Sequence, residues 1–268
     1  MSRRDDIDNL YHQSEVVQKM AIAFFWMNII VGIVLAFLPT PEPATEPAMK
    51  STIESITKIG AISQTVSAAL YLMLTLADDY YCWYSAEANR RKNNIETAFG
   101  VRLGELQTEG YYNNSLPTSV GKYAVNVFES SFFTNELSRK MIPVAMLKAG
   151  ISIVVMIIAA FIVPDIGILS IILQAVFTAS FIEDAVSLLR YHALVKETFD
   201  SLYKAFVTVG VERREQEITV FSEAVEYEAI KAHFKIRLNS KLFQKLNTEL
   251  STRWSEIESR IKYNAGST

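Results

Sequence analysis

Polar residues recur on one helix face inside an otherwise apolar stretch of the chain. Five of them follow one another at spacings of 3, 4, 4 and 3 residues: Gln64, Ser67, Tyr71, Thr75 and Asp78. Polar side chains are costly against lipid, so such a face turns towards other helices or towards water. The stripe therefore predicts either interhelical packing or the lining of an aqueous path that forms when several protomers assemble.

A later apolar stretch repeats this pattern in a shorter form, with polar residues at Ser170, Gln174 and Thr178. The two stretches together supply the candidates for pore-lining residues: Gln64, Ser67, Tyr71, Thr75, Gln174 and Thr178. The apolar stretches contain few charged residues, whereas a transporter with coupled ion sites would be expected to carry more of them.

A run of three basic residues, Arg90, Arg91 and Lys92, follows a cluster of tyrosines and one tryptophan at 80–84. Aromatic residues of this kind favour the interface between a membrane and water. The basic run would lie near the lipid headgroups, where basic residues attract anionic lipid. Its role is then to set topology, or alternatively to contact an anion or a nucleotide.

No reaction is predicted from the remaining residues. The three histidines, His12, His192 and His233, share no metal-ligand spacing with carboxylates. The sequence contains no P-loop, GxGxxG, GxSxG or HExxH motif. We expect no catalytic residue, no metal and no cofactor. A net charge of −3 argues against direct binding of nucleic acid.

Four apolar blocks position these residues, at 20–38, 59–77, 142–163 and 166–182. Each approaches the roughly 20 residues with which a helix crosses a bilayer. Only Pro164 and Asp165 separate the last two blocks, so these form a tight helical hairpin. A buried helix of a soluble protein is the alternative for each block, and a signal peptide is the alternative for the first. The first two blocks favour spanning because each has 19 residues without a charge.

The distribution of basic residues predicts the orientation. The segments 1–19, 78–148 and 183–268 hold 3, 8 and 13 lysines and arginines, 24 together, whereas the loops at 39–58 and 164–165 hold 2. Both termini and the central segment are therefore expected in the cytoplasm. The single cysteine, Cys82, permits no intrachain disulfide and fits a reduced compartment.

The expected fold is all-α, an integral membrane protein with four transmembrane helices in two hairpins. Its segments are a cytoplasmic tail (1–19), a first hairpin with a Pro-rich outer loop (20–77), a helical cytoplasmic insert (78–141), a second hairpin (142–182) and a helical C-terminal region (183–268). Within the insert, one helix continues from the second block and another covers 120–141, with a break between 110 and 117. A further break is expected near Gly210.

An apolar stripe runs through the last predicted helix at spacings of 4, 4, 3 and 4: Leu246, Leu250, Trp254, Ile257 and Ile261. These spacings approach a heptad repeat. The stripe predicts either packing within the protomer or association with a neighbouring copy.

Two stretches beside the insert carry a family resemblance. AEANRRKNNIETAFGVRL (86–103) is similar to a helix that follows the second span, and NVFESSFFTNELSRKM (126–141) to a stretch leading into the third span, in one family. These are the SMODS-associated four-transmembrane proteins, bacterial antiphage effectors that accompany cyclic-oligonucleotide synthases. The order of two spans, an insert, two spans and a helical tail also resembles that family.

The resemblance implies an effector of the bacterial inner membrane that is silent until infection. A cyclic nucleotide or a cytoplasmic protein partner would trigger assembly into a homo-oligomer, which would permeabilise or depolarise the membrane in abortive infection. Two alternatives stay open. The chain could be a non-conducting membrane sensor or scaffold that recruits a soluble partner, or an ordinary small channel.

Overall fold

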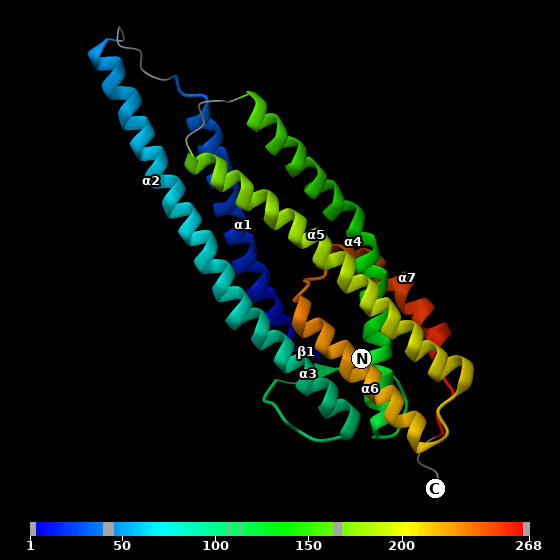
Figure 1. The fold of residues 1–268 in the computed structure, drawn as a ribbon. Coiled ribbons are helices and arrows are strands. Elements are labelled where there is room, and N and C mark those ends of the chain that lie inside the picture. The colour runs from blue at the N-terminus through cyan, green and yellow to red at the C-terminus, as the bar shows by residue number, and fades with distance from the viewer. Residues whose placement is uncertain (1–3, 40–45, 107, 113, 163–167, 265–268) are drawn as a thin grey trace. The chain divides into compact units, whose positions relative to one another are not determined.

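The computed structural model describes residues 4–39, 46–106, 108–112, 114–162 and 168–264, and at 4, 36, 109, 159–162 and 168–178 it describes the backbone alone. Helices dominate these residues (Figure 1), which confirms the expected all-α class. Two strands of two residues each accompany them, β1 (Arg4–Asp5) and β2 (Thr108–Glu109).

The helices follow one another with few interruptions. In chain order they are α1 (Asp8–Ala36), α2 (Pro47–Ala77), the π-helix η1 (Asp78–Cys82), α3 (Trp83–Phe99), α4 (Val120–Ile162), α5 (Ile168–Tyr203), the π-helix η2 (Lys204–Val209), α6 (Arg214–Phe234) and α7 (Ser240–Glu258).

The chain divides into two compact units. The hairpin unit comprises Asp5–Arg90 with Ala159–Leu173, and the body unit comprises Met1–Arg4, Arg91–Ile158 and Gln174–Thr268. Each unit is described by itself below.

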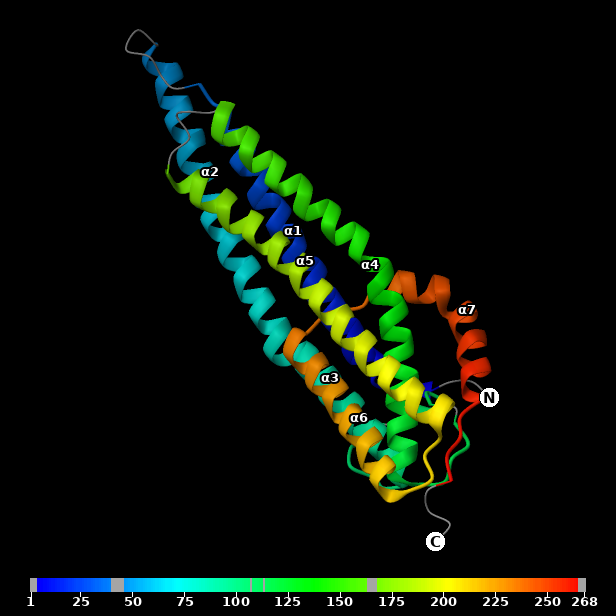
Figure 2. The same ribbon diagram turned by 45° about the vertical axis from the view of Figure 1, so that its right-hand side comes forward.

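In the hairpin unit, α1 and α2 lie side by side along their lengths (Figures 1 and 2). Pro47 is the first residue of α2, a position where its missing N–H costs no helical hydrogen bond. The buried residues of α1 follow one another at spacings of 7, 4 and 3: Ser14, Ala21, Phe25 and Asn28. These are the spacings of a heptad, and they explain how the two helices stay in contact over many turns.

The body unit is built around an aromatic core. Phe128 of α4 is fully buried, and its ring lies 5.8 Å from that of Phe206 in a stacked geometry and 5.1 Å from that of Trp254 edge-on. Phe199 and Phe132 complete the cluster, with ring centroids 5.9 Å apart. The core thus joins α4, α5, η2 and α7. In the C-terminal stripe, Leu250 and Trp254 are buried within the protomer, which favours packing within the protomer. Association of the stripe with a neighbouring copy stays a prediction.

Two helix boundaries differ from the expected ones. The first insert helix ends at Phe99 because Gly100 adopts a positive φ of 67°, a common way to end a helix. The expected helix over 120–141 instead continues to Ile162 as one helix with Pro143 inside it. Proline in a helix removes one backbone hydrogen bond but can be accommodated by a bend. The expected break near Gly210 is present, where φ is 95°.

Among the described residues, three helical segments are long and apolar enough to cross a membrane: Asp8–Leu35, Pro47–Phe99 and Val120–Ile158. In α4, the apolar part is the C-terminal portion that begins at Ile142. The predicted fourth block and the turn at Pro164 and Asp165 fall largely on positions outside the described residues or described by backbone alone.

Candidate functional site

The predicted polar stripe of α2 meets α1 near the middle of the hairpin. Asn28 of α1 donates from Nδ2 to the backbone oxygen of Gln64 at 2.8 Å and to Oγ of Ser67 at 3.3 Å. Ser67 in turn donates to the same Gln64 oxygen at 3.1 Å. Asn28 is 2% exposed, Gln64 7% and Ser67 0%. In the protomer, this polar contact is therefore sealed between two helices.

Glycines make room for this contact. A Cβ added at Gly32 would lie 2.7 Å from Nε2 of Gln64, so a larger residue there would displace the amide. A Cβ at Gly60 would lie 2.6 Å from the side chain of Leu35. Small residues at both positions allow the two helices to approach closely, as in many membrane helix pairs.

The other stripe residues lie closer to the hairpin surface. Tyr71 is half-buried, and its ring lies 5.6 Å from that of Phe25 on α1. Thr75 is also half-buried. The side chains of Gln174 and Thr178 lie outside the described residues. The structure thus brings Gln64 and Ser67 together with Asn28, a partner that the stripe on α2 alone does not identify.

Several exposed hydroxyls of α2 donate hydrogen bonds to the backbone of their own helix. Thr57 and Thr65 each donate to a backbone oxygen four residues earlier, at 2.9 Å. Ser55 does the same at 2.8 Å. A hydroxyl bonded in this way can face lipid without an unsatisfied polar group. These residues therefore serve as matched controls for the buried stripe.

A second set of polar contacts lies at the end of the hairpin where α1 begins and α2 ends. Ser14 of α1 donates to Oδ1 of Asp78 at 2.5 Å, and Asp78 is 2% exposed. Tyr11 donates to Oε1 of Glu87 at 2.8 Å, and its ring lies edge-on to Trp83 at 5.5 Å. Asp78 begins the π-helix η1, and such irregular turns are frequent at functional sites. The predicted N-terminal tail is thus helical from Asp8 and is tied to η1 and α3.

The predicted basic run is largely engaged in ion pairs. Arg90 Nη2 lies 2.8 Å from Oδ2 of Asp5, within the hairpin unit. Arg91 Nε lies 3.1 Å from Oε2 of Glu228, within the body unit. The side chain of Arg90 is 9% exposed and that of Arg91 30%, whereas Lys92 is exposed. A headgroup or anion contact by this run stays a prediction, with Lys92 the most accessible of the three.

The body unit holds a polar cluster that sequence reasoning missed. Glu136 of α4 accepts hydrogen bonds from Arg139 at 2.7 Å and from Arg253 of α7 at 3.1 Å. Burial raises the pKa of Glu136, but the two arginines outweigh burial and bring it below its usual value. Two residues after Glu136, Oγ of Ser138 lies 3.0 Å from Nδ1 of His192 on α5. The only sequence signal was the spacing of Glu136 and Arg139 by three residues.

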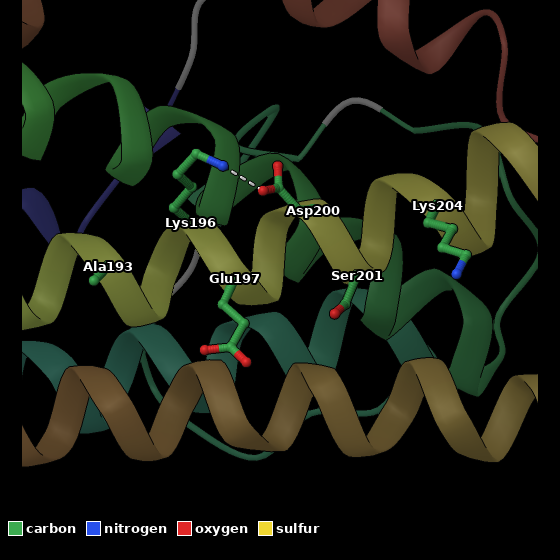
Figure 3. Close-up of a pocket in the computed structure, with 6 residues that line it drawn as sticks. All are labelled: Ala193, Lys196, Glu197, Asp200, Ser201 and Lys204. Carbon is green, nitrogen blue, oxygen red and sulfur yellow. Dashed lines mark hydrogen bonds and ion pairs between the residues drawn. The ribbon is translucent and has the colours of Figure 1, made fainter.

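A shallow polar depression lies along α5 and the start of η2. Figure 3 shows its lining side chains, which follow one helix face: Ala193, Lys196, Glu197, Asp200, Ser201 and Lys204. Lys196 and Asp200 form an ion pair across one turn. Burial raises the pKa of Glu223 on α6, and the charge of Glu197 raises it further. Because α5 and the η2 segment that continues it supply all six residues, this depression is an open surface feature.

In the part of the chain that the structure describes, no group of three or more histidine, cysteine, aspartate or glutamate side chains could hold a metal ion.

Comparisons with models of protein families, with curated proteins and with solved structures found no match.

Proposed function

We propose that this chain is a multi-pass protein of the bacterial inner membrane that acts as an antiphage effector. It has four transmembrane helices in two hairpins, and both termini lie in the cytoplasm. On an upstream signal, a cyclic nucleotide or a cytoplasmic protein partner, copies assemble and permeabilise the membrane.

Exposed apolar side chains support the membrane part of this proposal. In the most apolar 18-residue stretch of α2–α3, 11% of the stretch is buried within the protein. In the most apolar 18-residue stretch of α4, the buried share is 6%. Met73 and Leu147 are 65% and 63% exposed. Apolar surface of this extent is rare on soluble monomers, and lipid is the solvent that covers it.

The observation that carries the effector proposal is the contact of Asn28 with Gln64 and Ser67, buried within an apolar hairpin. Polar groups in a span are costly unless they pack or function. In the protomer, α1 covers them, so the resting hairpin is closed. Assembly that replaces contacts with α1 by contacts between copies turns Gln64 and Ser67 towards a shared aqueous path.

Dye release from liposomes tests this proposal. The wild-type protein at a high ratio of protein to lipid is expected to release the dye, and the variant with leucine at Gln64, Ser67 and Thr75 is expected to retain it. The control Thr65→Leu alters a hydroxyl on the exposed face and should release dye as the wild type does. Leakage from the triple-leucine liposomes at the wild-type rate would exclude a path along this face. Flotation with the vesicles identifies a variant that has failed to insert.

A second candidate function is a non-conducting sensor or scaffold. The same contact favours it, because the side chains of Asn28 and Ser67 are hydrogen-bonded within one protomer, to each other and to the backbone oxygen of Gln64. The body unit would then recruit a soluble partner. An oligomer that assembles in liposomes and leaves them sealed would favour this candidate.

A further inference from the structure

Two arginines converge on one buried carboxylate shortly before the apolar part of α4. Glu136 is 8% exposed, and each of its oxygens accepts from a different guanidinium, Oε2 from Arg139 and Oε1 from Arg253. The arginine side chains are themselves 57% and 42% exposed. Nη1 of Arg253 also lies 4.0 Å from Oε1 of Glu249, so two carboxylates balance the two guanidiniums. The exposed Lys140 gives the cluster a net positive charge.

The guanidiniums are held in place. Arg253 lies over the ring of Phe132, 5.3 Å from its centroid, which fixes the plane of its fork. Glu136 accepts a hydrogen bond from one edge of each guanidinium group. A guanidinium has five N–H donors, so the exposed edges can donate to a further anion. An arginine held by packing and an ion pair loses little conformational freedom when it binds a phosphate.

This cluster lies beside the part of α4 that is proposed to enter the membrane. Arg139 precedes Ile142 by three residues, or about 4.5 Å of helix. Exposed apolar side chains begin within the next two turns, with Val144 56% exposed and Leu147 63%. The arginines therefore lie at the depth of lipid headgroups when this stretch lies in hydrocarbon.

We propose that Arg139, Lys140 and Arg253 bind the phosphate of an anionic phospholipid in the leaflet that α4 enters. Arginine matches phosphate with two parallel hydrogen bonds, and the positive charge of the cluster complements the headgroup. The proposal rests on the membrane insertion of α4 under the proposed function, but not on pore formation. It differs from the basic run at 90–92 in exposure, because the side chains of Arg139 and Arg253 are 57% and 42% exposed and those of Arg90 and Arg91 are 9% and 30% exposed.

Thermal unfolding of the full chain in detergent tests the proposal, with phosphatidylglycerol, phosphatidylcholine or inorganic phosphate added. A ligand that binds the folded state raises the melting temperature. Phosphatidylglycerol should raise it most. Arg139→Gln and Arg253→Gln should each weaken the apparent affinity about five-fold, which corresponds to the loss of one basic contact at a membrane surface. Lys140→Gln should do the same and leaves the Glu136 ion pairs intact. The control is Arg214→Gln, an exposed arginine of α6.

Three outcomes would overturn the proposal. Equal stabilisation by the two lipids would show that the headgroup charge is not recognised, and equal stabilisation by inorganic phosphate would remove the lipid assignment. If the ion pairs only hold α7 on α4, the arginine variants lower the melting temperature alike with and without lipid, and Lys140→Gln changes nothing.

Flotation after an alkaline carbonate wash separates this proposal from the proposed function. Protein that stays in phosphatidylcholine vesicles but shows no preference for phosphatidylglycerol contradicts only the lipid site. Protein that the wash removes contradicts membrane insertion itself.

Discussion

Replacing Asn28 by leucine removes both hydrogen bonds by which α1 holds the polar stripe of α2. The side chain is nearly isosteric, so packing in the hairpin is retained. The lost bonds are those to the Gln64 oxygen at 2.8 Å and to Ser67 Oγ at 3.3 Å. Interhelical hydrogen bonds in membrane proteins average about 0.6 kcal/mol each and reach about 1.7 kcal/mol. Asn28→Leu is therefore expected to lower the free energy of unfolding by about 1 kcal/mol.

Unfolding of the reconstituted protein by a denaturing detergent measures this cost. A double-mutant cycle with Ser67→Ala isolates the contact at 3.3 Å, and its coupling energy should be about 0.5 kcal/mol. Thr65→Val is the control, since its hydroxyl bonds to its own helix at 2.9 Å. The reasoning that α1 seals the stripe would be refuted by a coupling energy of zero. It would also be refuted if Thr65→Val lowered the free energy of unfolding as much as Asn28→Leu does.

Three further predictions concern the body unit. Gly121→Ala should destabilise it by about 1–3 kcal/mol, because the added Cβ would lie 2.1 Å from the ring of Tyr263. The control is Gly150→Ala, whose added Cβ would meet nothing within 4 Å and should not destabilise the unit. Thermal unfolding of the two variants compares them. Phe128→Ala should lower the stability of the body unit by about 3–5 kcal/mol in the same assay, since the Phe128 ring is fully buried in the aromatic core. Burial and the charges of Arg139 and Lys196 lower the pKa of His192 below 6.5, so the unfolded chain binds its proton more readily and stability should fall as pH drops below about 6.5. His192→Gln should flatten that part of the pH profile, and an unchanged profile would exclude His192 as its source.

Much of the helical fold follows from periodicity and composition. The uncharged block at 59–77 lies within α2, and the break at Gly210 follows from a residue that tolerates positive φ. The end of α3 at Phe99 was harder to predict, because the sequence beyond Gly100 keeps helix-forming residues. Pro143 within α4 was equally unpredictable, since a proline ends a helix or bends it according to tertiary context.

The candidate site could be predicted only in part. The spacing of Gln64 and Ser67 places them on one face, but it does not say what that face meets. Asn28 is a lone polar residue in an apolar block, so its position in the sequence predicts no partner. Only the register of α1 against α2 brings it to Ser67. Contacts across long separations, such as Arg253 with Glu136, depend on how helices pack and leave no local signal.

Thiol labelling at position 67 tests the central claim most directly, that α1 seals the polar face until copies assemble. In a Cys82→Ser background, a single cysteine replaces Ser67 or, as the control on the exposed face of α2, Thr65. Cells are treated with a maleimide that reacts only with hydrated thiols, before and after expression reaches the level that collapses the membrane potential. The account predicts that Ser67→Cys is protected before depolarisation and labelled after it, while Thr65→Cys stays unlabelled throughout. A Ser67→Cys thiol that stays protected in fully depolarised cells would contradict it.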